Sequence, residues 1–206
     1  MLIDFDTIAR DFKSEIRGVI HIGAHHGQEY DSYVKHGIKN LMFFEPIASN
    51  YEKLLKKIPK SKDIKTFNAA LGNYIGTRVM YAEDVNDGQS CSLLPPGTHL
   101  SLYPDIKFDR HEVVWVDKLD NIVFDRGLYN MINIDVQGYE LEVFRGAMET
   151  LRHIDIVYAE VNTEPVYKGC PLIADIDAFL RNYGMERIMT SFPCRAWGDA
   201  YYKKIR

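Results

Sequence analysis

The chain has 206 residues, 46% of them hydrophobic, which is enough to bury one substantial core and is close to the usual size of one domain. The formal net charge is −4, from 25 Lys plus Arg against 29 Asp plus Glu. This balance argues against a nucleic-acid-binding protein, which needs a basic surface to displace counterions. We therefore predict one domain over residues 1–206 with a small or neutral substrate.

The cysteines and the N-terminal residues indicate the compartment. Cys91, Cys170 and Cys194 lie far apart with no C-x-x-C spacing, so neither a zinc site nor a disulfide scaffold is expected. Charged residues interrupt the apolar residues of the first 18 positions, unlike in a signal peptide, and no uncharged apolar stretch approaches the length of a membrane span. These features predict a cytoplasmic protein without a membrane partner. They leave its oligomeric state open.

In the first third of the chain, short apolar runs alternate with segments of helical period, which predicts strands joined by crossover helices. The strands are Gly18–Ile22 and Leu41–Phe44. A glycine turn and a helix ended by Gly37 follow the first strand. The residues expected on the inner faces of the two helices are Tyr30, Tyr33 and Val34, and then Tyr51, Leu54, Leu55 and Ile58.

The next segment departs from this alternation. Ile64–Leu71 is predicted to be a third strand, and the glycines after it predict a hairpin into Arg78–Ala82. From Glu83 to His111 the chain is polar and rich in turn residues, so we expect a long excursion over the active site. Loops of this length inside a compact domain are usually functional or mobile.

The second half returns to strands and helices. Glu112–Val116 is a predicted strand, and Asn130–Ile134 and Ile154–Val161 are apolar enough to be buried on both faces of a sheet. Met185–Ser191 and Ala200–Ile205 are separated by a loop too short for a crossover helix, so they are expected to pair antiparallel. The residues expected on inner helix faces are Leu141, Phe144, Met148 and Leu151, and then Ile173, Ile176, Phe179, Leu180 and Tyr183. A parallel sheet that ends in a hairpin favours the methyltransferase variant of the doubly wound fold.

The turn after the first strand is a candidate cofactor site, because ligands of such sheets lie beyond the carboxyl ends of the strands. Gly23 and Gly27 let the backbone approach a ligand and present amide hydrogens at a helix N-terminus. Their spacing is G-x-x-x-G and not G-x-G-x-x-G, which suits a ligand with a carboxylate, such as S-adenosylmethionine, better than a diphosphate. A purely structural turn is the alternative.

Glu45 ends the second strand roughly twenty residues after this turn, where a carboxylate accepts the hydroxyls of a ribose. The alternative is a Glu that caps the helix beginning after Pro46. Asn68 and Ala69, near the end of the third strand, are expected to border the adenine, with ordinary strand-end packing as the alternative.

Carboxylates and imidazoles supply the candidate catalytic groups. Asp135 and Glu160 follow the two buried strands and can accept a proton from a substrate hydroxyl or hydrogen-bond the amino group of the cofactor. His25 and His26 are alternative bases, although a polar turn residue is an equally good interpretation of either. These groups form no compact metal motif, so no metal site is predicted.

The two tryptophans have different expected roles. Trp115 is expected in the core. Trp197, placed in the hairpin loop, is expected either to stack on a sugar or to pack.

Five segments together resemble the FkbM-type methyltransferases. They are VIHIGAHHGQE (Val19–Glu29), FFEP (Phe43–Pro46), NAALG (Asn68–Gly72), NIDVQGYELEVFRGAMETL (Asn133–Leu151) and AEVN (Ala159–Asn162). The resemblance implies an α/β class I methyltransferase (Rossmann-like) fold, with a mostly parallel seven-stranded sheet ending in an antiparallel hairpin and helices on both faces. It also implies S-adenosylmethionine as cofactor and a hydroxyl of a sugar, glycan or secondary metabolite as acceptor.

Two positions depart from the family pattern: His21 stands where many members have Asp, and Asn133 where Lys often precedes the strand-end Asp. We expect acceptor specificity to lie in residues 83–111 and in Thr163–Cys170. The catalytic residues predicted for the whole site are Asp135, Glu160 and His26. The predicted cofactor-binding residues are His21, Gly23, Ala24, Gly27, Glu45, Asn68, Ala69 and Asp135.

The predicted function is O-methyl transfer from S-adenosylmethionine to a hydroxyl, with the protein aligning the acceptor and excluding water. One alternative is a nucleotide-sugar or NAD-linked enzyme, against which the missing G-x-G-x-x-G and the final hairpin argue. The other is a cofactor-fold module that binds a partner without catalysis.

Overall fold

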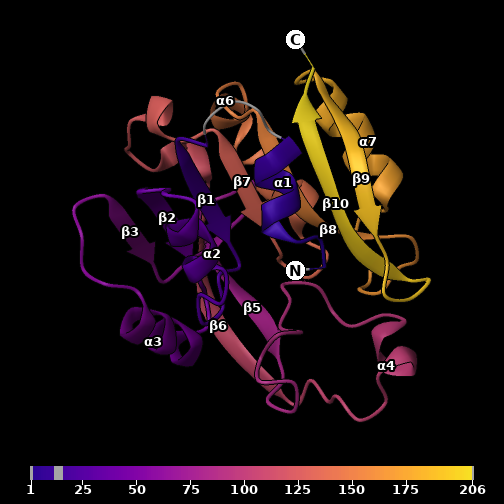
Figure 1. The fold of residues 1–206 in the computed structure, drawn as a ribbon. Coiled ribbons are helices and arrows are strands. Elements are labelled where there is room, and N and C mark those ends of the chain that lie inside the picture. Colours follow the sequence, from indigo (N-terminus) through magenta and orange to yellow (C-terminus); the bar gives the residue numbers. More distant parts are fainter. Residues whose placement is uncertain (1, 12–15, 206) are drawn as a thin grey trace.

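A computed structural model describes residues 2–11 and 16–205 and contains a seven-stranded sheet of order β3-β2-β1-β7-β8-β10-β9 (Figure 1). The parallel strands are β3 (Ile64–Phe67), β2 (Asn40–Phe44), β1 (Gly18–Ile22), β7 (Met131–Ile134) and β8 (Ile156–Asn162). β10 (Trp197–Lys204) runs antiparallel to β8 and to the edge strand β9 (Met185–Ser191). The predicted fold class and final antiparallel pair are confirmed.

Alternating side chains of the strands bury two cores, one on each face of the sheet, as strand geometry requires. Val19 and Phe43 face a core that includes residues of the first three helices, whereas Ile20 and Met42 face the core of the last three helices. The first three helices are α1 (Phe5–Asp11), α2 (Tyr30–Lys35) and α3 (Ala48–Lys57). The last three are α5 (Glu140–Arg145), α6 (Met148–Leu151) and α7 (Ile173–Arg181).

A second, three-stranded sheet of order β4-β6-β5 packs into the same core as α5 and α6. Its strands are β4 (Ala70–Leu71), β6 (Arg110–Asp117) and β5 (Gly76–Ala82). The predicted strand Ile64–Leu71 is therefore wrong as one element, and so is its hairpin with Arg78–Ala82, because β5 pairs with β6. Asn68 bends the chain here by donating from Nδ2 to the carbonyls of Glu45 (2.9 Å) and Pro46 (3.0 Å).

The predicted excursion is loop-like and holds one short helix, α4 (His99–Leu102). It lies at the end of the sheet toward which the parallel strands point, together with β5 and β6 at the bottom of Figure 1. Backbone pairing fixes it at two places, between Tyr81 and Ser92 and between Pro96 and Tyr167. The excursion is thus an ordered wall beside the carboxyl ends of the strands.

Three smaller predictions are corrected. The helix expected from Leu141 to Leu151 is broken at Gly146, where a Cβ would lie 1.8 Å from the carbonyl oxygen of Gly72. Trp115 is not in the core: its side chain lies on the outer face of β6 and is 48% exposed. Trp197 is the first residue of β10 and not part of a hairpin loop. Two 3₁₀ helices, η1 (Leu119–Asn121) and η2 (Arg126–Leu128), connect β6 to β7.

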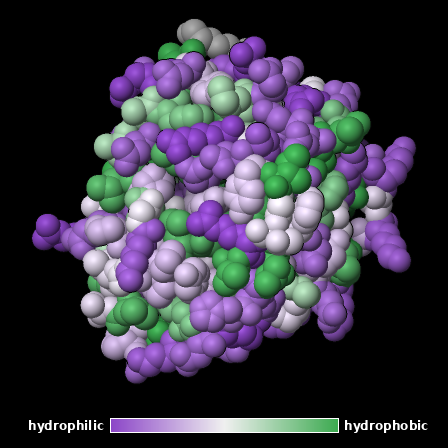
Figure 2. Space-filling view, turned by 180° about the vertical axis from the view of Figure 1, so that it is seen from behind, coloured by the Kyte–Doolittle hydropathy of each residue, from purple (hydrophilic) through white to green (hydrophobic). Residues whose placement is uncertain are grey.

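The surface seen from behind is mixed in polarity, with hydrophobic residues in small groups separated by polar ones (Figure 2). Among the helices described for residues 2–11 and 16–205, none has both the length and the apolar character of a membrane span.

Candidate active site

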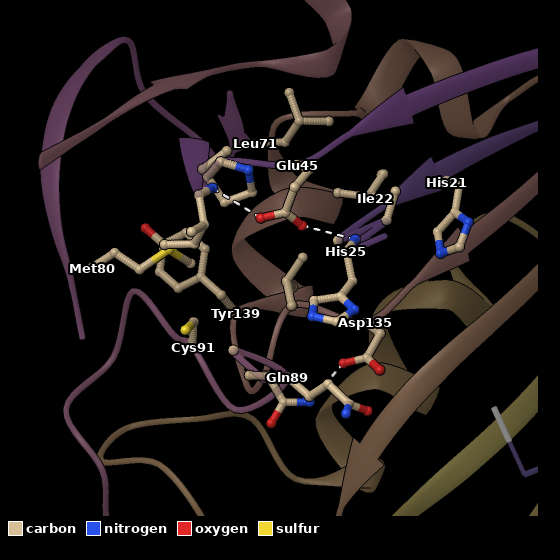
Figure 3. A pocket seen from close by; sticks show the side chains of 18 of the residues that line it. His21, Ile22, His25, Glu45, Leu71, Met80, Gln89, Cys91, Asp135 and Tyr139 are labelled. Atoms are coloured by element: carbon tan, nitrogen blue, oxygen red, sulfur yellow. Dashed lines mark hydrogen bonds between the residues drawn. The ribbon is translucent and has the colours of Figure 1, made fainter. Parts of the chain in front are cut away.

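A cavity of about 230 Å³ lies where the carboxyl ends of β1, β2 and β7 meet β4, β5 and the excursion. Figure 3 shows Glu45 and Asp135 reaching it from different strands, with Met80, Cys91 and Tyr139 on one side and His21 on the other. The position is the one that the switch point of a doubly wound sheet predicts for a ligand.

Glu45 is the most buried carboxylate of this cavity, with 5% of the residue exposed. Its two oxygens accept the backbone N–H groups of His25 (2.8 Å) and Ile47 (2.9 Å). Burial raises the pKa of Glu45 to about 7, although these hydrogen bonds and one from Asn50 oppose the shift. With these three donors the carboxylate retains one lone pair for a further donor, so a contact with a ribose hydroxyl is chemically available.

The glycine turn has a different role from the one expected. The N–H groups of Gly23 and Ala24 both donate to the carbonyl of Phe44, at 3.0 and 2.9 Å, so they are not directed at a ligand carboxylate. Gly23 has φ +80°, and a Cβ there would lie 1.8 Å from the carbonyl oxygen of Asp135. Gly27 packs against Leu54 of α3 and lies outside the cavity lining, whereas Gly23 and Ala24 belong to it.

One wall of the cavity is apolar and suits a flat aromatic base. Its residues include Ala69, Leu71 and Met80, and the thiol of Cys91. Burial raises the pKa of Cys91 to about 11, so the thiol stays neutral in this wall. Ala69 is therefore placed as expected, but Asn68 is exposed, does not line the cavity and acts on the backbone instead.

At the other end, the two positions that depart from the family pattern contact each other. His21 and Asn133 are register partners on β1 and β7, with His21 Nε2 3.4 Å from Asn133 Nδ2. Tyr33 joins both, through His21 Nδ1 (3.2 Å) and Asn133 Nδ2 (2.6 Å). Burial lowers the pKa of His21, so it is a neutral imidazole in the cavity wall. Glu29 also lines this end, with its carboxylate 3.9 Å from His21.

A second cavity of about 280 Å³ shares Gln89, Asp135 and Gln137 with the first. Glu160 lines this second cavity and not the first. Its other lining residues include polar and aromatic side chains of the excursion and of β10, namely His99, Tyr103, Trp197 and Asp199. Asp135 therefore stands between two adjoining spaces.

Gln137 connects the two candidate catalytic carboxylates. Its Nε2 donates to Asp135 Oδ1 (2.7 Å) and Glu160 Oε2 (2.5 Å), and its Oε1 accepts the hydroxyl of Tyr167 (2.7 Å). Burial, and then the charge of Asp135, raises the pKa of Glu160 well above its usual range. Two neighbouring carboxylates do not readily ionise together, so these conditions favour a proton on Glu160.

The structure does not bring His26 to either cavity. Its Nε2 lies 3.1 Å from Asn50 Oδ1 and its Nδ1 3.5 Å from Asp87 Oδ2. His25 does line the first cavity, and its ring stacks on that of His26 at 3.6 Å. We therefore do not retain His26 as a candidate base.

The sequence matches the methyltransferase FkbM domain over residues 21–186, which is most of the chain. The chain belongs to the FkbM methyltransferase family. A curated relative, the 2-O-methyltransferase NoeI of Sinorhizobium fredii, is 26% identical over 198 residues, covering 91% of this chain and 79% of that protein. This FkbM protein is thus a methyltransferase, and its cofactor is S-adenosylmethionine.

Solved structures have the same fold at low sequence identity. The putative tRNA (m1A22) methyltransferase Sp1610 of Streptococcus pneumoniae, in complex with S-adenosyl-L-methionine, has a TM-score of 0.55 and 12% identity, covering 99% of this chain and 73% of its own. The magnesium protoporphyrin IX methyltransferase of Synechocystis, also with bound cofactor, has a TM-score of 0.54 and 9% identity, covering 96% and 74%. These neighbours establish the class I methyltransferase fold.

Sequence reasoning missed three residues of this FkbM site. Gln137 joins the carboxylates, and Glu140 Oε1 accepts the N–H groups of Val136 and Gly138, both at 3.1 Å, which shapes the loop after β7. Both belong to the segment IDVQGYE, which carried the strongest resemblance. His99 had no sequence signal, because it lies in the aperiodic excursion. It is 3% exposed, and its Nδ1 has no hydrogen-bond partner among the residues described.

Proposed function

We propose that this FkbM methyltransferase transfers the methyl group to a hydroxyl oxygen of a sugar or glycan. The observation that carries the proposal is the second cavity, which adjoins the cofactor cavity at Asp135 and is lined by carboxyl and aromatic groups. The name of the relative NoeI, a 2-O-methyltransferase, supports oxygen as the acceptor atom.

The first cavity has the groups that S-adenosylmethionine needs. Glu45 would accept a ribose hydroxyl, the wall that includes Ala69 and Met80 would contact the adenine, and the carboxylate of Glu29 would receive the ammonium group. When bound, the cofactor supplies an electrophilic methyl group on a positively charged sulfur. The chain needs only to hold the acceptor in line with that methyl group and exclude water.

Asp135 is the proposed base, because a hydroxyl attacks well only as its proton leaves. Gln137 occupies Oδ1 of Asp135, so Oδ2 is the atom that takes the proton from the acceptor hydroxyl. The raised pKa of Glu160 favours a proton on that carboxyl group, so Glu160 is not the proposed base. Glu160 also lines the second cavity, and its carboxyl group is hydrogen-bonded to that of Asp135, so it would position the proposed base.

The second cavity suits a sugar for two reasons. Trp197 and Tyr103 lie side by side, with Trp197 Nε1 donating to the Tyr103 hydroxyl at 2.8 Å, and aromatic rings pack well against the C–H faces of sugars. The buried Nδ1 of His99 lacks a partner among the described residues, and a substrate hydroxyl would satisfy it. The net charge of −4 makes a nucleic acid a poor acceptor.

The test is transfer of labelled methyl groups from S-adenosylmethionine to a panel of sugars, glycans and secondary metabolites. We expect a methyl ether on a sugar, and mass spectrometry with permethylation analysis locates the carbon that bears it. A product methylated on nitrogen or carbon would refute O-methyl transfer. Tight cofactor binding without transfer to any acceptor of the panel would instead favour the binding-module alternative.

A further inference from the structure

His25, His26 and Asp87 form a cluster at the rim of the cofactor cavity that the proposed reaction does not use. One ligating atom from each lies within 4.8 Å of the other two, and His26 Nδ1 is 3.5 Å from Asp87 Oδ2. The histidines belong to the turn after β1, whereas Asp87 belongs to the excursion, about sixty residues later in the chain. The cluster thus joins two segments that both contribute to the cavity lining.

The contacts of His26 leave an unfavourable gap between two acceptors. Asn50 lowers the pKa of Glu45 through a hydrogen bond, so the amide nitrogen of Asn50 is directed to that carboxylate and Oδ1 to His26. Nε2 of His26 therefore carries the hydrogen donated to Oδ1, at 3.1 Å. The Nδ1 lone pair of a neutral ring then faces Asp87 Oδ2 at 3.5 Å, a gap between two acceptors that a positive charge would fill.

That positive charge is either a proton on His26 or a metal ion. The hydrogen bond to Asn50 is the arrangement found at metal-bound histidines, whose second nitrogen donates to a fixed acceptor.

The other two ligands are held in place as well. The buried carboxylate of Glu83 accepts the N–H groups of Asn86 (2.6 Å) and Ser90 (3.1 Å), which folds the turn that presents Asp87. His25 Nε2 lies 2.7 Å from the carbonyl oxygen of Asp87, and its Nδ1 accepts Gln28 Nε2 at 2.6 Å. Rotation of the Gln28 amide would let Nδ1–H donate to Oε1 and would leave Nε2 of His25 as a ligand.

We propose that His25, His26 and Asp87 bind one divalent ion of the kind that prefers imidazole, Zn²⁺ or a similar ion, which ties the excursion to the glycine turn over the cofactor. Two imidazoles and one carboxylate match such ions and not Mg²⁺, which prefers oxygen ligands. Gly88 and Gln89 directly follow Asp87 and line the cofactor cavity. An ion at this place should therefore slow exchange of the cofactor.

Lys53 gives the proposal a sharp test. Its Nζ lies 2.9 Å from Asp87 Oδ1, and the side chain is 48% exposed. The ammonium group competes with a metal ion for the same carboxylate, but it can leave the site because its stem is flexible and half in solvent. We expect Lys53→Met to tighten ion binding, whereas a merely structural role of the cluster predicts no such gain.

The experiment is calorimetry of Zn²⁺ with tag-free protein, accompanied by the visible absorption of bound Co²⁺. We expect one ion per chain, an affinity about tenfold or more weaker in His26→Gln and Asp87→Asn, and no change in the exposed control His153→Ala. Stopped-flow release of S-adenosylhomocysteine should be slower with Zn²⁺ in the wild type, and unaffected by it in Asp87→Asn. Unfolding temperatures near that of the wild type verify that the variants are folded.

Two results would overturn the proposal. One is the absence of stoichiometric Zn²⁺ and Co²⁺ binding, with NMR showing the His26 ring doubly protonated at neutral pH, since a proton would then fill the gap. The other is binding that His26→Gln and Asp87→Asn leave unchanged, which would place the ion elsewhere.

Discussion

Replacing Glu45 by Gln tests the cofactor site most directly. The carboxylate accepts two backbone N–H groups, and in Gln one oxygen becomes an NH₂ group that must face one of these donors. The ribose hydroxyls would also lose an ionised acceptor. Hydrogen bonds to charged groups contribute about 1.5–3 kcal/mol, so the dissociation constant of S-adenosylhomocysteine should rise roughly 10- to 150-fold.

The pH dependence makes this prediction specific to Glu45. Its pKa is raised to about 7 by burial, so part of the free protein carries a protonated Glu45 near neutrality. Hydroxyl donors prefer the ionised form, so binding lowers this pKa and releases a proton. With a pKa of about 7, affinity should rise about tenfold between about pH 6 and pH 8. Glu45→Gln lacks this titration and should show only the dependence that the ligand itself contributes.

Isothermal titration calorimetry in buffers of different ionisation enthalpy measures both the affinity and the number of protons released. Wild type and Glu45→Gln are compared at each pH, so the amino group of the ligand cancels. The same pH slope in both proteins, or an unchanged dissociation constant in the variant, would refute the role of Glu45 as the ribose acceptor.

Four further predictions concern the base, the turn, pH stability and metal ions. Asp135→Asn keeps an oxygen that accepts the hydrogen bond from Gln137 but removes the basic carboxylate. Turnover should therefore fall about 10²- to 10⁴-fold with little change in unfolding temperature. Weaker cofactor binding with preserved turnover would contradict this prediction. Gly23→Ala should unfold at a clearly lower temperature than the control Gly37→Ala. Both glycines have positive φ, but only a Cβ at Gly23 would meet a carbonyl oxygen, at 1.8 Å. Equal decreases in unfolding temperature would contradict this prediction. Burial raises the pKa of Glu140 to about 7 in the folded protein. The stability that Glu140 contributes is therefore full below its pKa in the unfolded chain and is lost as the pH rises through about 7. Thermal melts of Glu140→Gln should show a smaller loss of stability over this pH range, and the same loss as in the wild type would contradict the prediction. EDTA should leave the single-turnover rate of methyl transfer intact, and a loss restored by Mg²⁺ would refute a metal-free reaction.

The main sheet could be predicted because its strands have simple signals. The central strands β7 and β8 are mostly apolar, and all of their residues are buried. The short link between Met185–Ser191 and the last strand required antiparallel pairing, which β9 and β10 show. Glu45 and Asp135 both line the first cavity because each directly follows a strand that ends at the switch point, and their predicted roles stay predictions.

The second sheet could not be predicted in the same way. β5 resembles the return strand of a hairpin, but its partner β6 lies beyond the whole excursion. The hairpin prediction assumed that neighbouring strands in sequence pair with each other. Where β3 ends, Asn68 donates to the carbonyls of Glu45 and Pro46 in a distant segment, a contact that no local sequence pattern encodes.

The second cavity, which we propose to hold the acceptor, could not be predicted from the sequence for a related reason. Its lining combines His99 and Tyr103 of the excursion with Trp197 and Asp199 of β10, nearly a hundred residues apart. Neither segment has a helical or strand period that predicts which side chains turn inward. Only the general expectation that residues 83–111 contribute to acceptor binding could be made, and the second cavity supports it.

His21 and Asn133 show how two departures from a family pattern can amount to one change. In sequence they are separate and each raises its own question about the methionine end of the cofactor. In the structure they are neighbours across β1 and β7, and Tyr33 bonds both. The two positions therefore belong to one hydrogen-bonded group in the cavity wall, and a substitution at either one changes the contacts of the other.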